Sequence, residues 1–171
     1  MKTNDFILFL FCLSIVFSSC QQQTEQTNWK LSSPDGQVTV KISSVKSIDH
    51  NSYVSLEYSV WLTQSEVEKE VVSSSPLGII REDQDFSDNL QFIKVSPVKT
   101  IDEEYEMLSG KQLKNRNHAN ELVLSFKNAQ DNNIDLIFRA YNEGIAFCYH
   151  FPGESESPVT IKKELTGFQM P

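Results

Sequence analysis

Residues 54–62 read Val-Ser-Leu-Glu-Tyr-Ser-Val-Trp-Leu, and this stretch decides the fold class of the chain. Apolar or aromatic side chains stand at positions 54, 56, 58, 60 and 62, with polar side chains at three of the four positions between them. Successive side chains of a β-strand point to opposite faces, so this period of two places the apolar set on one face. The stretch therefore predicts a long strand in a sheet with one buried face.

The same period of two recurs along the chain, at residues 38–42, 122–126, 134–140 and 145–151. Turn-forming sequences separate the predicted strands: Ser-Pro-Asp-Gly at 33–36, Gln-Asp-Asn-Asn at 130–133 and Asn-Glu-Gly at 142–144. Residues 82–90 are acidic and irregular, which predicts a surface loop. No window shows a capped stripe with the 3.6-residue period of a helix. We therefore predict an all-β fold, a β-sandwich or barrel.

The charge of the chain excludes two classes of partner. The sequence has 171 residues and a formal net charge of -8. Nucleic-acid binding needs clustered Lys and Arg to neutralise phosphates, so we expect no nucleic-acid partner. The same charge argues against docking on an anionic membrane surface by electrostatic attraction. The length is sufficient for one domain with its own core.

The first 28 residues indicate that the protein is exported and are not expected to belong to the folded domain. Lys2 precedes an apolar run at residues 6–17, which is short for a membrane span and has the form of a signal peptide. Phe-Ser-Ser-Cys at 17–20 resembles a bacterial lipobox, so we interpret residues 1–19 as a lipoprotein signal and Cys20 as the lipidated residue. An ordinary secretory signal with an incidental Cys20 is the alternative. Residues 20–28 are polar and predict a flexible tether.

The remaining cysteine is predicted to be structural. Cys12 leaves with the signal and Cys20 carries lipid, so Cys148 has no partner for an intramolecular disulfide. It stands in an apolar strand pattern, which favours a small buried core residue. His150 lies two residues away on the same strand face, but a nucleophilic thiol needs a lowered pKa and a basic neighbour. We therefore favour the core interpretation over Cys–His chemistry.

The chain lacks a complete set of catalytic residues. Glycosidases need two carboxylates across the scissile bond, yet the acidic residues here cluster in charge runs typical of exposed strand ends and turns, at 66–70, 102–104 and 154–156. His50, His118 and His150 share no zinc-like spacing. No calcium hand, phosphate loop or nucleophile elbow is present. The residues alone therefore predict no catalytic centre.

Several segments together resemble one family. They are Ser-Pro-Asp-Gly at 33–36, Ser-Pro-Leu-Gly at 75–78, Tyr-Glu-Met-Leu-Ser-Gly-Lys at 105–111, Asn-Arg-Asn-His-Ala-Asn-Glu-Leu at 115–122, Phe-Arg-Ala-Tyr-Asn-Glu-Gly-Ile-Ala-Phe at 138–147 and Glu-Leu-Thr-Gly-Phe at 164–168. In this order and spacing they resemble the N-terminal domain of glycoside hydrolase family 97, over residues 29–171. Cys148 departs from the pattern, because a larger polar or basic residue is expected there.

The resemblance implies a role in cleaving carbohydrate. Such enzymes are calcium-dependent α-glycosidases, retaining or inverting, that act on α-linked glucosides or galactosides. Their N-terminal domain is a galactose-mutarotase-like β-super-sandwich, and the (β/α)₈ barrel that follows carries the catalytic carboxylates. By resemblance, Glu164 is the candidate calcium ligand contributed by this domain. A surface carboxylate beside Lys162 and Lys163 is the equal alternative for Glu164.

The resemblance also sets expectations for the whole protein. The chain ends at Pro171, where the family's sandwich continues, so we expect an incomplete sandwich from a truncated gene model or split gene, inactive on its own. Expected partners are an α-linked oligosaccharide and the catalytic barrel, and the expected location is the cell envelope, as a periplasmic or outer-membrane lipoprotein. The alternatives are a stand-alone glycan-binding lipoprotein, with Trp29, Trp61 or Tyr141 as sugar platforms, and a structural envelope protein.

Overall fold

The computed structural model describes residues 28–46, 54–153 and 158–171, and every regular element within them is a strand. The predicted signal peptide, Cys20, nearly all of the tether and His50 lie outside the described residues. None of the described residues belongs to a helix that is long and apolar enough to cross a membrane. The all-β prediction is confirmed.

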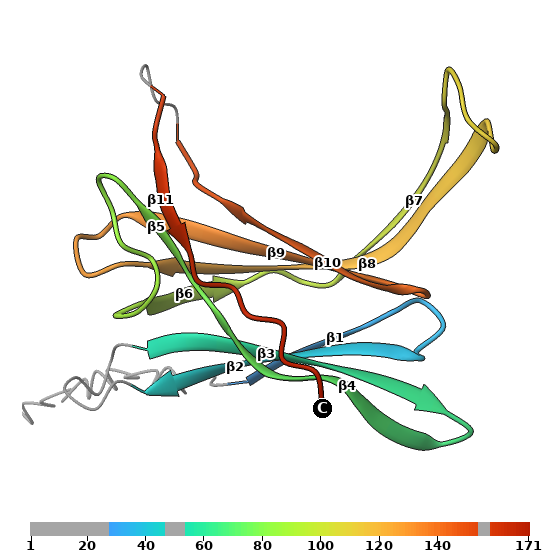
Figure 1. Cartoon of the computed structure of the whole chain (residues 1–171), viewed down its shortest axis with the longest axis horizontal. Coiled ribbons are helices and arrows are strands. Elements are labelled where there is room, and N and C mark those ends of the chain that lie inside the picture. Colours follow the sequence, from blue (N-terminus) through green and yellow to red (C-terminus); the bar gives the residue numbers. More distant parts are fainter. Residues whose placement is uncertain (1–27, 47–53, 154–157) are drawn as a thin grey trace, which may run out of the picture.

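Two antiparallel sheets face each other and form a sandwich (Figure 1). The first sheet has its strands in sequence order: β1 (Asn28–Ser32), β2 (Val38–Lys46), β3 (Val54–Gln64) and β4 (Val67–Leu77). The second sheet has the order β10-β9-β8-β6, with β7 paired to the other half of β8: β6 (Gln91–Val95), β7 (Lys99–Glu106), β8 (Lys114–Lys127), β9 (Asn133–Tyr141) and β10 (Gly144–His150).

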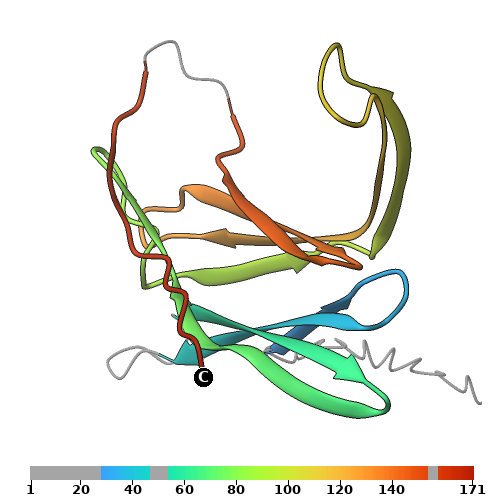
Figure 2. The ribbon, with the colours of Figure 1, turned by 45° about the vertical axis from the view of Figure 1, so that its right-hand side comes forward.

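A third, two-stranded sheet stands at one end of the sandwich. It pairs β5 (Ile79–Arg81) with β11 (Ile161–Glu164), antiparallel, so that the C-terminal part of the chain returns to the middle of the sequence. Beyond β11, the chain follows β4, because Gly167 N donates to Pro76 O at 2.9 Å and Ser73 N donates to Gln169 O at 2.8 Å. Figure 2 shows this segment crossing from the second sheet to the first.

The core forms where the predicted apolar faces of the two sheets meet. The alternate residues of β2, β3, β8 and β9 are buried as predicted, among them Val40, Ile42, Leu56, Tyr58, Leu124, Leu136 and Phe138. The ring of Trp29 packs against both Phe92 and Phe126, with centroid separations of 5.1 and 5.7 Å. On β10 the inward residues Phe147 and Tyr149 are only half-buried, because β10 is the last strand of its sheet.

The charge-rich segments that the structure describes lie in different settings. The acidic run at 66–70 lies at the β3–β4 turn and the start of β4, as expected of such runs, whereas 102–104 lies in the middle of β7. Residues 82–90 are irregular as predicted, but Phe86 and Leu90 in this loop are buried and belong to the core. Burial of these two side chains fixes the loop on the end of the sandwich.

We expect replacement of Leu124 by Ala to lower the free energy of unfolding by about 2–5 kcal/mol, because the residue is fully buried between the sheets and its loss leaves a cavity. Urea unfolding followed by tryptophan fluorescence measures this difference. The matched control is Leu108→Ala, at a fully exposed leucine, with an expected change of less than about 0.5 kcal/mol. Equal effects of the two substitutions would contradict the assignment of the core.

Candidate functional site

The outer face of the second sheet carries Cys148, and the prediction of a buried core thiol is wrong. Inward positions on β10 are Ile145, Phe147 and Tyr149, so Cys148 points outward and is exposed. Its cross-strand partner is Ile137. The imidazole of His150 lies against a different residue, because its Nδ1 is 3.2 Å from Asp135 Oδ2. Among the residues that the structure describes, no basic side chain is a partner of the thiol, so the geometry does not support a Cys–His site.

Polar cross-strand pairs flank Cys148 on this outer face. Asp135 accepts a 2.6 Å hydrogen bond from the hydroxyl of Ser125 on the neighbouring strand and also faces His150. On the same face of β9, four residues after Asp135, Arg139 donates to Glu121 at 2.8 Å. This hydrogen bond raises the pKa of Arg139. Each charged group is thus matched to a neighbour, as expected of pairs that stabilise a sheet.

Glu164 is the last residue of β11 and is exposed. It pairs with Ile79 across the small sheet and lies close enough to Tyr149 for its charge to add to the raised pKa of that phenol, for which burial is the main cause. Among the described residues, no group of three or more His, Cys, Asp or Glu side chains is placed to hold a metal ion. The role of Glu164 as a calcium ligand therefore stays a prediction.

The three aromatic residues considered as sugar platforms differ in exposure. Trp29 is only 4% exposed and belongs to the core, so it is unable to stack on a sugar. Trp61 is half-buried on the outer face of β3, where Lys41 Nζ lies 4.0 Å from the ring centroid and covers one face of the indole. Tyr141 is half-buried on the outer face of β9. These positions weaken the case for a platform built on tryptophan.

The carboxyl groups with perturbed pKa values are shifted in one direction. Hydrogen bonds from Ser33, Arg81 and Arg116 lower the pKa of Asp35, Asp83 and Asp102, respectively. The acid of a glycosidase needs the opposite shift, because it must hold a proton near neutral pH. These three aspartates are therefore suited to ion pairs and turns rather than to proton donation.

A pocket that the sequence analysis did not predict lies at the end of the sandwich, between the β5–β11 pair and the β8–β9 turn. Its volume is about 340 Å³, and Arg81, Gln84, Asn132 and Phe151 are among the residues that line it. The guanidinium of Arg81 is 4.7 Å from the centroid of the Phe151 ring. The sequence predicts the turn at 130–133. Its contact with the loop at 82–90 joins segments that are far apart in the sequence, and no local sequence pattern indicates it.

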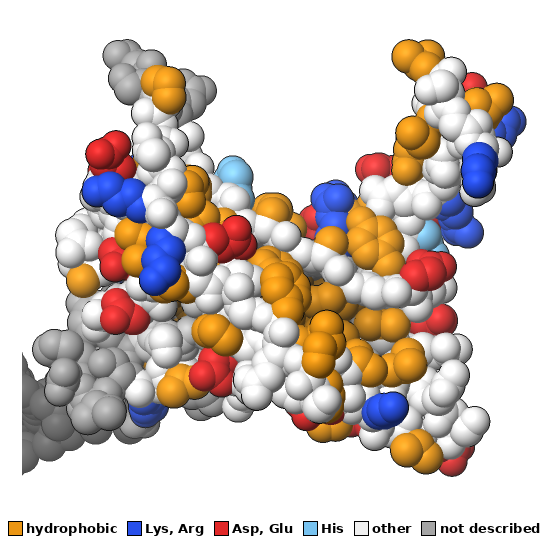
Figure 3. Space-filling view, in the orientation of Figure 1, with side chains coloured by type: hydrophobic (Ala, Val, Ile, Leu, Met, Phe, Trp, Pro, Cys, Tyr) orange, Lys and Arg blue, Asp and Glu red, His pale blue; other side chains and the backbone are white. Residues whose placement is uncertain are grey.

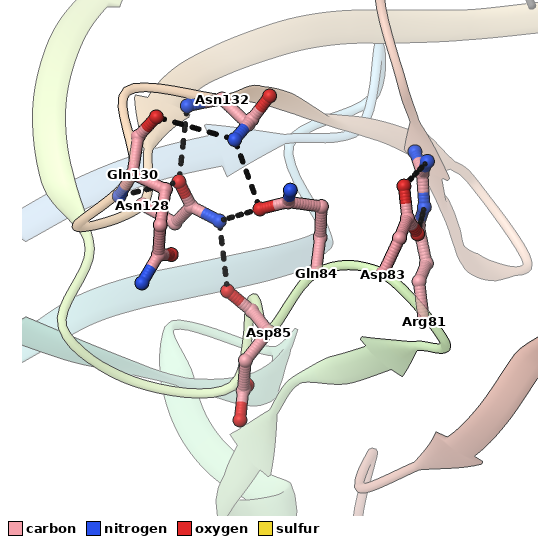
Figure 4. A network of polar contacts seen from close by, with 7 residues as sticks. All are labelled: Arg81, Asp83, Gln84, Asp85, Asn128, Gln130 and Asn132. Carbon is pink, nitrogen blue, oxygen red and sulfur yellow. Dashed lines mark hydrogen bonds and ion pairs between the residues drawn. The ribbon is translucent and has the colours of Figure 1, made fainter.

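Asn128 organises this end of the sandwich (Figure 4). Its Oδ1 accepts from the backbone N–H groups of Gln130 and Asn132, both at 3.0 Å, and closes the β8–β9 turn. Its Nδ2 donates to Gln84 Oε1 at 2.8 Å and to the carbonyl of Asp85 at 3.2 Å. Because Asn128 is buried, these bonds join the turn to the 82–90 loop at a site without competing water.

The family model described as glycosyl-hydrolase 97 N-terminal matches residues 31–171, which is most of the chain. The chain belongs to this family. The resemblance identified from the sequence segments is thereby confirmed, together with the β-sandwich class. The segments at 33–36, 75–78 and 164–168 fall at the β1–β2 turn, at the β4–β5 junction and at the end of β11, respectively, so the family pattern follows the ends of strands.

Solved structures of complete family 97 enzymes contain the same fold. A glycoside hydrolase family 97 enzyme from Pseudoalteromonas sp. strain K8 in complex with panose superposes with a TM-score of 0.67 and 24% identity over 83% of this chain. A glycoside hydrolase family 97 enzyme from the same strain in complex with acarbose gives a TM-score of 0.64 and 25% identity over 83% of this chain. A beta-arabinopyranosidase gives 0.65 and 28% over 84%.

The family 97 N-terminal domain described here is a small part of those enzymes. It covers 20% of the Pseudoalteromonas chain and 21% of the beta-arabinopyranosidase chain. The solved structures that it matches are therefore about four times its length. Activity and substrate in those proteins belong to the whole enzymes, of which this chain spans about a fifth.

We expect Asn128→Ala to lower the free energy of unfolding by about 1–3 kcal/mol, because it removes a buried side chain that is the acceptor for the N–H groups of Gln130 and Asn132 and one of the two donors to Gln84 Oε1. Urea unfolding measures the loss. Gln130→Ala is the control, since Gln130 contributes only backbone groups to the network and its side chain is exposed. A neutral Asn128→Ala substitution would show that the network does not stabilise the fold.

Proposed function

We propose that this domain is the accessory N-terminal sandwich of a calcium-dependent family 97 α-glycosidase that hydrolyses α-linked glucosides or galactosides. Its role is to support the catalytic (β/α)₈ barrel and to line the barrel's sugar pocket. The family match over residues 31–171 carries this proposal. The complexes of a family 97 enzyme with panose and acarbose favour an α-linked oligosaccharide as the substrate. The beta-arabinopyranosidase neighbour shows that related enzymes act on another sugar.

The chemistry of the described residues supports an accessory role. Hydrolysis of a glycosidic bond requires an acid and a nucleophile or base, held about 5–10 Å apart across the substrate. The carboxyl groups with resolved pKa shifts in this domain are stabilised in the charged form, which disfavours the acid role. The catalytic pair is accordingly assigned to the barrel, whose strand ends carry catalytic residues in this fold.

A long hairpin offers a contact surface for the barrel. The β7–β8 arm, residues 99–118, rises away from the sandwich in Figure 1. Two-stranded ribbons are marginally stable alone, and the arm is braced by a bidentate pair in which Arg116 donates to Asp102 at 2.6 and 2.7 Å. Ion pairs of this kind orient the arm without covering its tip.

The tip of the β7–β8 arm is apolar and uncovered. Its exposed large hydrophobic side chains gather at one end, as Figure 3 shows, and are Tyr105, Met107, Leu108 and Leu113. Leu108 is as exposed as in an extended chain, at 106%. Exposed apolar clusters of this kind mark contact sites for other proteins or domains. We assign this tip to the catalytic domain, because the matched enzymes carry about three times the length of this chain outside the shared fold.

Glu164 is assigned to the calcium site of the complete enzyme. Calcium takes six to eight oxygen ligands, so one carboxylate is only part of a site. The side chain fits this role because it is exposed at a strand end and has no ion-pair partner among the described residues. Bound calcium would neutralise charge beside the sugar pocket, and Glu164 would orient it from the sandwich side. The other ligands are assigned to the barrel.

Export and anchoring complete the proposal. Residues 1–19 act as a lipoprotein signal, and Cys20 carries the lipid that holds the protein in the cell envelope, on the periplasmic side or in the outer membrane. The polar residues 21–27 supply the spacing between the anchor and β1, which begins at Asn28. A lipid anchor on a tether leaves the surface of the sandwich available to soluble oligosaccharide.

We expect the purified chain to give no hydrolysis of an aryl α-glucoside or an aryl α-galactoside, because the catalytic pair lies outside it. Release of the chromophore over many hours, with a complete family 97 enzyme as positive control, measures this. Turnover that follows the chain through purification, and that persists after a change of expression host, would contradict the accessory role.

A fusion tests the role of the arm. We expect residues 28–171, joined to the catalytic portion of the Pseudoalteromonas family 97 enzyme, to lose thermal stability when Met107 and Leu108 are both replaced by Ser. The isolated chain should keep its melting temperature, because both side chains are exposed there. Val67→Ser, at another exposed apolar residue, is the control and should change neither protein. Equal melting of the fusion and its double variant would exclude the arm as the contact.

A further inference from the structure

The pocket at the end of the sandwich has the size and lining of a small-molecule site. Its volume of about 340 Å³ lies at the lower end of the range for ligand pockets, ~300–1,000 Å³. Arg81 comes from β5, Gln84 from the 82–90 loop, Asn132 and Asn133 from the β8–β9 turn, and Phe151 from the end of β10. Residues far apart in the sequence thus converge on one concave surface.

The amides in this pocket are held in fixed orientations. Gln84 Oε1 accepts from Asn128 Nδ2 at 2.8 Å and from Asn132 Nδ2 at 2.9 Å, which fixes which end of the Gln84 amide is the oxygen (Figure 4). Gln84 Nε2, Asn132 Oδ1 and the side chain of Asn133 then have no hydrogen-bond partner among the described residues. The pocket therefore presents both donors and acceptors that are available to a ligand.

The arginine of the described lining is paired with a carboxylate beside the pocket. Arg81 is the one ionisable residue in its described lining. Arg81 donates to both oxygens of Asp83, at 3.0 and 2.7 Å, and this bond lowers the pKa of Asp83. A paired arginine offers little net attraction to an anion. The site is accordingly suited to a neutral ligand.

The apolar part of the lining is built around Phe151. The ring of Phe151 lies against Phe86, with centroids 5.3 Å apart, and the Arg81 guanidinium stacks over it at 4.7 Å. Ile161 of β11 adds an aliphatic side chain to the wall. A ligand that fits must combine hydroxyl groups for the amides with C–H surfaces for this wall. Sugar rings have this combination.

We propose that this pocket is a saccharide-binding site, which takes one or two units of a neutral oligosaccharide. Gln84 Nε2 donates to a sugar hydroxyl, Asn132 Oδ1 and the Asn133 amide bind neighbouring hydroxyls, and Phe151 packs on the ring edge. The choice of an α-linked glucose oligomer as the sugar rests on the proposed function. The existence of the site rests on the pocket itself.

Titration of the ¹⁵N-labelled full chain with panose tests the proposal, with arabinose as a second probe. We expect saturable shifts in the side-chain amide signals of Gln84, Asn132 and Asn133. Gln84→Glu keeps an oxygen for Asn128 and Asn132 to donate to but removes the Nε2 donor, so we expect about three- to tenfold weaker binding with an unchanged melting temperature. Asn133→Ala, outside the network, should weaken binding as well.

Trp61→Ala is the matched control, because Trp61 lies on the outer face of the other sheet, and it should leave binding unchanged. The absence of saturable shifts with both sugars would overturn the proposal. Binding that Trp61→Ala abolishes and that Gln84→Glu and Asn133→Ala both leave intact would overturn it too. Failure here is distinguishable from failure of the accessory role, because that role is tested by hydrolysis and by the fusion, which do not involve these variants.

Discussion

The face-to-face burial of alternate side chains from two sheets is the constraint on which the rest of this domain depends. Leu124 and Phe138 on the second sheet, and Val40 and Leu56 on the first, lose nearly all contact with water. Apolar burial is worth ~25 cal/mol per Å², so this layer is the main favourable term in folding. The backbone hydrogen bonds of the strands become obligatory once this layer excludes water.

That single layer positions the peripheral features. β8 is fourteen residues long, and its second half lies in the core while its first half extends outward as one strand of the β7–β8 arm. Phe86 enters the same core and brings Gln84 and Arg81 to the β8–β9 turn, where Asn128 joins the two. Tyr58 donates to the carbonyl of Gly167 at 2.9 Å and holds the segment that follows Glu164. The same buried layer thus positions the arm, the pocket and Glu164.

The strands with a strict period of two were predictable from sequence, because a half-buried strand needs that pattern and nothing else. β4 and β7 were not, since β7 and the first part of β4 carry mostly exposed side chains, Glu104 and Glu68 among them, and so lack a regular apolar alternation. Cys148 is exposed because it alternates with the inward residues Phe147 and Tyr149 on β10. The apolar residues on both sides of it made this alternation hard to see in the sequence. The pocket depends on contacts between residues 84 and 132, which no local pattern encodes.

We propose that this domain is a necessary support for a separate catalytic domain, with a contact tip and a sugar site of its own. Its most direct test is the kcat/KM of the fusion of residues 28–171 to the catalytic portion of the Pseudoalteromonas family 97 enzyme, measured on the parent enzyme's substrate. We predict that the fusion is clearly more active than the catalytic portion alone. A folded fusion that is no more active than the catalytic portion alone would contradict the account.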